Sequence, residues 1–127
     1  MYNVNTLIET MTQEDKDLLF KDLCARLPYN VIMTNIELPE THYPLTCEDL
    51  HDAMFDDDWD DVPYLRPLSS MTEEEQLELS VVPIYARMLD NASAQIDWLN
   101  AHHFDYRGLI EKGLAIAATE DNNPYID

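Results

Sequence analysis

Between Thr12 and Pro28 the apolar residues recur at the spacing of an amphipathic helix. These residues are Leu18, Leu19, Leu23 and Leu27. Thr12 precedes an acidic first turn and can cap the start of this helix, while Pro28 would end it. Apolar residues at the same spacing predict a further short helix over residues 3 to 11. The N-terminal part of the chain is therefore predicted to be helical.

The middle of the chain changes pattern several times. Residues 29 to 38 are rich in β-branched side chains and predict a strand, whereas residues 39 to 46 carry two prolines and are expected to be irregular. Residues 46 to 55 have the pattern of a short amphipathic helix, which is expected to end at Asp56 because acidic residues follow it closely. Residues 62 to 68 contain two prolines and are expected to be extended, at an edge of a sheet rather than in its centre.

Two further helices are predicted in the second half. Thr72 and Glu75 have the spacing of a capping box, and the helix that follows is expected to break or kink at Pro83. Asn91 or Ser93 can cap the next helix. After it, a turn of helix over residues 105 to 113 and a last strand over residues 114 to 119 are expected.

These elements predict an α+β domain, mostly helical, with four or five short helices packed on a small sheet or hairpin. The strand at residues 29 to 38 could pair with residues 62 to 68 or 114 to 119. A length of 127 residues and a hydrophobic content of 46% are typical of one folded core. We expect a single acidic domain over residues 1 to 119 and a flexible tail over residues 120 to 127.

Charge narrows the possible functions. The 26 acidic and seven basic residues give a net charge of -19, which disfavours direct binding to nucleic acid. The few arginines, Arg66 and Arg107 among them, are expected to pair with carboxylates inside the protein. Cys24 and Cys47 form no metal-binding or disulfide pattern and are expected to be free thiols. Without a signal-peptide pattern or an apolar run near the ~20 residues of a membrane helix, a cytoplasmic protein with no membrane contact is expected.

The densest charge lies in residues 46 to 61, which carry eight carboxylates and no lysine or arginine. The candidate partner-binding residues are Glu48, Asp49, Asp52, Asp56, Asp57, Asp58, Trp59, Asp60 and Asp61. Such a run can be solvated, can hold a cation, or can meet a positively charged partner. It lacks the spacing and the glycine of a calcium-binding EF-hand loop. Trp59 either pins the run to the protein body or projects toward a partner.

A second candidate site is the pair His102 and His103, beside Asp105 and Tyr106. These side chains could line a pocket for a small ligand or a divalent metal. Catalysis would need a nucleophile or an oxyanion site as well, and no recognisable motif supplies one. A histidine pair at the end of a helix can also have a purely structural role. No catalytic residue, metal site or cofactor is therefore predicted.

Two blocks of the sequence resemble a widespread group of small uncharacterised proteins from gut Bacteroidales, their phages and mobile elements. The first block is Pro-Tyr-Leu-Arg-Pro-Leu-Ser-Ser-Met-Thr-Glu-Glu-Glu at residues 63 to 75. The second, residues 97 to 115, contains His-His-Phe-Asp-Tyr-Arg-Gly-Leu-Ile. The resemblance extends loosely over residues 12 to 118. It implies a phage or mobile-element origin and carries over no activity and no site residues.

Three functional hypotheses follow. The first is a non-enzymatic interaction protein whose acidic face occupies a basic surface of a host protein, such as a nucleic-acid-binding or defence protein, as a DNA mimic does. The second is a protein that binds a small ligand or a divalent metal through His102, His103 and nearby carboxylates. The third is a structural or assembly component whose acidity keeps it soluble. The oligomeric state is left open by the sequence.

Overall fold

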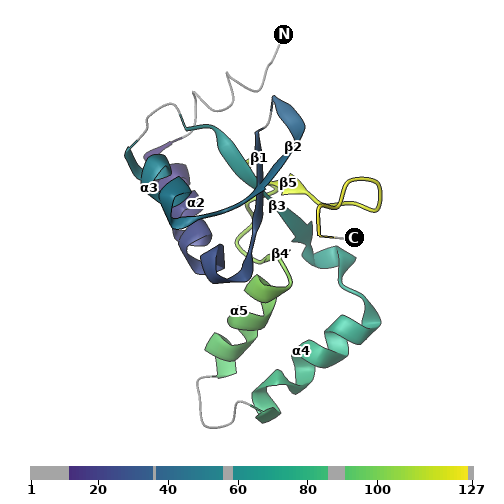
Figure 1. Cartoon of the computed structure of the whole chain (residues 1–127). Helices are drawn as coiled ribbons and strands as arrows, with labels where there is room; N and C mark the ends of the chain where they lie inside the picture. Colours follow the sequence, from purple (N-terminus) through teal and green to yellow (C-terminus); the bar gives the residue numbers. More distant parts are fainter. Residues whose placement is uncertain (1–11, 36, 56–58, 86–90, 126–127) are drawn as a thin grey trace.

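The computed structural model describes residues 12–35, 37–55, 59–85 and 91–125. In these ranges the chain forms four α-helices and a mixed five-stranded sheet, which confirms the predicted α+β class (Figure 1). The expected helix at residues 3 to 11 lies outside the described residues. Among the described residues, no helix is both long enough and apolar enough to cross a membrane.

Two helices of the N-terminal half form as the hydrophobic pattern predicts. Helix α2 (Gln13–Arg26) begins after Thr12, whose hydroxyl accepts a hydrogen bond from the Asp15 amide at 3.0 Å. A 3-10 turn, η1 (Leu27–Tyr29), contains Pro28 and ends the helix. Helix α3 (Cys47–Phe55) forms where the amphipathic pattern predicts it and packs against α2. Both predictions are therefore confirmed.

The strand predicted over residues 29 to 38 is shorter than expected. It is β1 (Ile32–Asn35), and a second strand, β2 (Leu38–Pro44), returns antiparallel to it. The prediction that residues 39 to 46 are irregular is therefore wrong. Because β2 is at the edge of the sheet, a proline in it need not remove a hydrogen bond to a neighbouring strand.

Strand β3 (Asp61–Pro67) occupies the centre of the sheet, so the predicted edge position of residues 62 to 68 is wrong. It pairs antiparallel with β1 and parallel with β4 (Phe104–Asp105) and β5 (Ile116–Ala117). Each of its two prolines is paired with a neighbouring strand on one side only. Pro63 lies opposite Met33 of β1, and Pro67 lies opposite Asp105 of β4. A central strand can therefore contain both of them.

Two helices follow β3 and the 3-10 turn η2 (Leu68–Ser70). They are α4 (Glu73–Tyr85) and α5 (Asn91–Ala101). The capping box is confirmed, since the Thr72 and Glu75 side chains each accept the other residue's backbone N–H, at 3.1 and 3.0 Å. No break occurs at Pro83, because α4 continues to Tyr85. Proline lacks the backbone N–H that would donate to the carbonyl of Leu79, so the helix continues past this residue with one hydrogen bond fewer.

The hydrophobic core lies between α2, α3 and the sheet, and the segment between β4 and β5 closes it. Its buried members are Leu19, Leu23, Val31, Met33, Leu45, Leu50, Leu65, Leu109, Leu114 and Ala115. In place of the expected helical turn, Asp105 accepts hydrogen bonds from the amides of Leu109 and Ile110, each at 3.0 Å. Of the strand expected over residues 114 to 119, two residues form β5.

The chain after β5 returns to the sheet. The Tyr125 hydroxyl donates to the carbonyl of Tyr64 at 2.7 Å and accepts from the amide of Ile32 at 2.9 Å. The Tyr125 ring stacks on His103, with ring centroids 3.7 Å apart. Up to Tyr125, this segment is therefore part of the folded domain rather than the flexible tail expected over residues 120 to 127.

Candidate functional site

Helix α3 carries the first acidic residues of the predicted site. Asp49 caps this helix, because its carboxylate accepts from the backbone N–H and the hydroxyl of Thr46, each at 2.9 Å. Leu50 is buried in the core and orients the helix. The structure therefore gives Asp49 a local structural role, while Glu48 and Asp52 remain exposed to solvent.

Two apolar side chains at the end of α3 are also exposed. Met54 is 57% and Phe55 is 70% accessible to solvent. Neither Glu48 nor Asp52 forms an ion pair with a lysine or arginine in the part of the chain that the structure describes. We refer to Glu48, Asp52, Met54 and Phe55 as the α3 surface. It combines carboxylates that have no described lysine or arginine partner with a large exposed aromatic ring. The exposed His51 ring lies 3.9 Å from Asp52, and its centroid is 4.8 Å from that of Phe55.

Asp60 and Asp61 are bound into the sheet. The Asn35 side-chain amide donates to Asp60 at 2.8 Å and to Asp61 at 2.9 Å, and the Tyr43 hydroxyl donates to Asp61. Burial, followed by the charge of Asp61, raises the pKa of Asp60. Burial and the hydrogen bond to Asp61 raise the pKa of Tyr43. These two carboxylates thus connect β1, β2 and the start of β3.

Trp59 packs against the hydrophobic core, and its indole N–H donates to the carbonyl of Asp61 at 3.2 Å. Of its two predicted roles, the structure supports the one in which Trp59 pins the acidic run to the protein body. Asp56, Asp57 and Asp58 lie outside the described residues. In the described part of the acidic stretch, the exposed aromatic residue is Phe55, which the sequence analysis did not single out.

His102 and His103 face different parts of the structure. The His102 ring stacks on Trp98 at 3.9 Å, and its Nδ1 lies 2.9 Å from the Trp98 carbonyl. His103 adopts a left-handed backbone conformation, with φ of 65°, and stacks on Tyr125. Burial, and then the nearby positive charge of Arg26, lowers the pKa of His103 to about 4. The ring is therefore neutral at pH 7.

The carboxylate and the phenol beside the two histidines are also engaged elsewhere. Asp105 caps the turn after β4, and the Tyr106 hydroxyl donates to the Asn100 side chain at 2.9 Å. Within the described residues, no group of three or more His, Cys, Asp or Glu side chains could hold a metal ion. The structure does not bring the side chains of His102, His103, Asp105 and Tyr106 together around one point where a substrate could react.

Sequence analysis missed a buried charge network between α2 and the segment after β4. Asp22 and Arg26 are fully buried, and Arg26 Nε donates to Asp22 at 2.7 Å. Arg26 Nη2 donates to the Phe104 carbonyl at 2.7 Å, and Arg107 Nε donates to Asp22 at 3.1 Å. The available signal was the pairing of acid and arginine four residues apart on one helix.

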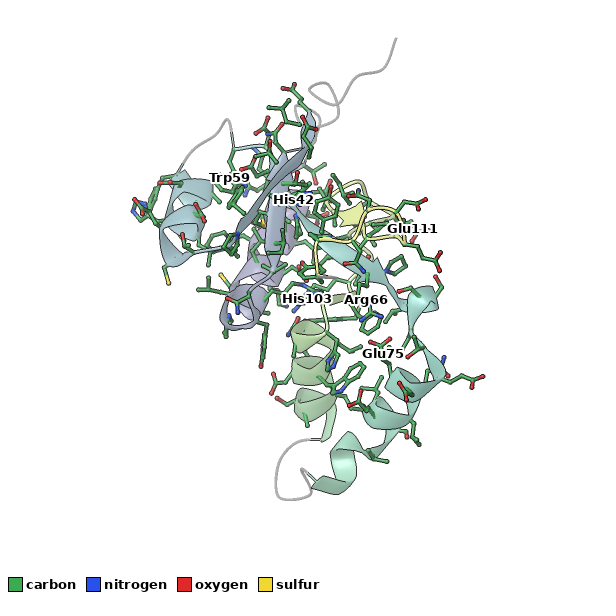
Figure 2. All side chains as sticks on the ribbon, turned by 45° about the vertical axis from the view of Figure 1, so that its right-hand side comes forward. His42, Trp59, Arg66, Glu75, His103 and Glu111 are labelled. Carbon is green, nitrogen blue, oxygen red and sulfur yellow. The ribbon has the colours of Figure 1, made fainter. Side chains whose placement is uncertain are left out.

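Arg66 forms a second ion pair, with Glu75, as Figure 2 shows between β3 and the start of α4. Both distances between guanidinium nitrogens and carboxylate oxygens are 2.7 Å. The guanidinium also lies over the Phe104 ring, 4.1 Å from its centroid. Hydrogen bonds from Arg66 lower the pKa of Glu75 to about 2. The expected internal pairing of Arg66 and of Arg107 is therefore confirmed.

Comparison with protein families, with curated proteins and with solved structures gave no significant match.

Proposed function

We propose that this protein is a non-enzymatic interaction protein that binds a basic surface of another protein through the α3 surface. The observation that carries the proposal is the exposure of Phe55 beside the carboxylates of Glu48 and Asp52. Large aromatic side chains contribute much of the binding energy at protein interfaces. Carboxylates that have no described lysine or arginine partner, placed around such an anchor, favour a binding partner rich in lysine or arginine.

The charge of the whole chain supports the same partner class. A net charge of -19 attracts a basic protein over a distance of about one Debye length and raises the rate of encounter. Association of this kind weakens as the salt concentration rises. Burial of the Phe55 ring is much less sensitive to salt, so it would retain part of the affinity.

The resemblance to proteins of phages and mobile elements adds a biological context. Small acidic proteins from such sources can act as DNA mimics against host nucleic-acid-binding or defence proteins. On this proposal the partner is a basic host protein, and the carboxylates of the α3 surface take the place of phosphates. A small-ligand or metal site has less support, because His102 and His103 face different elements.

The test is capture of a basic partner from host lysate by the full chain, followed by binding measurements on the purified partner. The test variant replaces Glu48 with Gln, Asp52 with Asn and Phe55 with Ala. A matched control, Glu111→Gln with Glu120→Gln, also removes two exposed carboxylates. Figure 2 shows Glu111 on the opposite side of the molecule from Trp59. Asp60 and Asp61 are left unchanged because they bind Asn35 in the sheet.

The expected result is that the test variant binds at least ~10-fold more weakly while the control keeps its affinity. Affinity of the unchanged protein should also fall steeply between roughly 0.05 and 0.2 M salt. Equal binding by the test variant and the unchanged protein would contradict the proposal. A third hypothesis, an assembly component, predicts instead a concentration-dependent increase of mass in light scattering.

A further inference from the structure

Helices α4 and α5 form an arm that extends away from the sheet (Figure 1). The hydrophobic core contains none of their described residues. Among the residues of the two helices whose side chains are described, Asn100 alone is buried. Most of the stability of a protein helix normally comes from the packing of its apolar face. The two helices also contact each other, and this packing helps to order the arm, whereas the exposed residues on its outer side are not covered by the core.

Polar contacts hold the start of the arm in place. Glu75 binds Arg66 of β3 through two hydrogen bonds of 2.7 Å and also caps α4 together with Thr72. On the second helix, Trp98 stacks on Phe104 with ring centroids 5.9 Å apart. The first turn of α4 is thus positioned relative to the sheet, although the outer face of the helix is not covered by it.

That outer face carries a stripe of three residues at helical spacing, Glu74, Leu77 and Glu78. Leu77 is 66% exposed, and both glutamates are exposed. Neither glutamate forms an ion pair in the part of the chain that the structure describes. Helix α4 contains no lysine or arginine to neutralise them. We refer to Glu74, Leu77 and Glu78 as the α4 stripe.

We propose that the α4 stripe is a docking surface for a basic amphipathic helix of another protein. Leu77 would pack against the apolar face of that helix, and Glu74 and Glu78 would meet its flanking lysines or arginines, as charged residues do beside an apolar helix seam. A second copy of this chain is disfavoured as the occupant, because each copy carries a charge of -19 and would place acidic α4 helices side by side.

This surface is separate from the α3 surface, so the two proposals can fail independently. The probe is a synthetic helical peptide of about three heptads, with Leu at the a and d positions and Lys at the e and g positions. A second peptide of the same composition, scrambled so that it has no apolar face, measures purely electrostatic attraction. Binding to the full chain is followed by titration calorimetry near physiological salt.

The expected result is that Leu77→Ala weakens binding of the amphipathic peptide by ~10-fold or more. Glu74→Gln with Glu78→Gln should weaken it and reduce its salt dependence. The matched control Glu111→Gln with Glu120→Gln, and the α3 variant Phe55→Ala, should keep the affinity. Because Leu77 is exposed, its replacement should leave the helical circular dichroism and the melting temperature nearly unchanged.

Three outcomes would overturn the proposal. The first is equal affinity for the amphipathic and the scrambled peptide, which would indicate attraction by charge alone. The second is unchanged peptide affinity in the Leu77→Ala variant. The third is a dimer of the unchanged protein in light scattering that Leu77→Ala dissociates, which would make a second copy the occupant.

Discussion

Replacement of Asp22 with Asn should destabilise the protein far more than the loss of any exposed carboxylate. Asp22 is fully buried and accepts hydrogen bonds from Arg26 at 2.7 Å and from Arg107 at 3.1 Å. The amide keeps the shape of the side chain but removes its negative charge. Arg26, which is also fully buried, would then have no anion beside it among the described residues.

The expected magnitude follows from the burial of both partners. Removing one member of a buried ion pair leaves an uncompensated charge and typically costs about 3–5 kcal/mol. Domains of this size have a free energy of unfolding of roughly 5–15 kcal/mol, so the variant would lose a large share of its stability. At the entropy of unfolding expected for 127 residues, the melting temperature should fall by roughly 10–20 °C.

Urea unfolding followed by circular dichroism measures this change. Asp52→Asn is the matched control, because Asp52 is exposed on α3 and should change the stability by no more than ~0.5 kcal/mol. Adding Arg26→Met to Asp22→Asn should recover part of the loss, since the unpaired buried charge is removed. A cost below about 1 kcal/mol for Asp22→Asn would refute the reasoning, because that is the range of surface ion pairs.

Three further predictions concern the contacts around the sheet. The pKa of His103 is lowered to about 4 in the folded protein, so the unfolded imidazole takes up a proton first as the pH falls below 6.5. The free energy of unfolding should therefore be highest above pH 6.5 and fall by on the order of 2 kcal/mol between pH 6.5 and 4. His103→Asn should flatten this part of the urea-stability profile; an unchanged profile would contradict the assignment. Glu75→Gln should lower the free energy of unfolding by about 1–2 kcal/mol at pH 7. The loss should shrink as the pH falls from 4.5 toward 2, because the carboxylate of the unchanged protein is then itself protonated. A loss of stability that does not depend on pH would argue against the ion pair. Tyr125→Phe should lower the stability measured by thermal unfolding by about 1–3 kcal/mol, because the Ile32 amide and the Tyr64 carbonyl lose the Tyr125 hydroxyl as their partner. An unchanged stability would show that the C-terminal segment does not stabilise the domain.

The helices were the most predictable part of the fold. Their signals are local: Thr12 before an acidic turn, the capping box of Thr72 and Glu75, and the apolar spacing that orients Leu50 inward. Strand pairing depends on residues distant in sequence. Pro63 and Pro67 therefore suggested an edge strand, because nothing nearby in the sequence shows that each proline meets a neighbour on one side only.

The candidate site divides in the same way. The acidic character of residues 46 to 61 is a property of composition and was evident from the sequence. Which of its side chains face solvent depends on distant partners. Asn35 binds Asp60 and Asp61, while Trp59 packs on the core. The exposure of Phe55 was not expected. Its position at the end of an amphipathic helix does not reveal that Leu50 is the residue of α3 that is buried in the core.

By itself, the sequence determined the net charge, the α+β class and the positions of the main helices, because these depend on composition and on neighbours within about one turn. The tertiary structure decided the central position of β3, the burial of Asp22 with Arg26 and the separation of the α3 surface from the α4 stripe. These features arise from contacts between segments far apart in the chain. Contacts between distant segments determine which hydrogen-bonding partners a side chain has and how far it is buried, and the spacing of residues along the chain does not specify either.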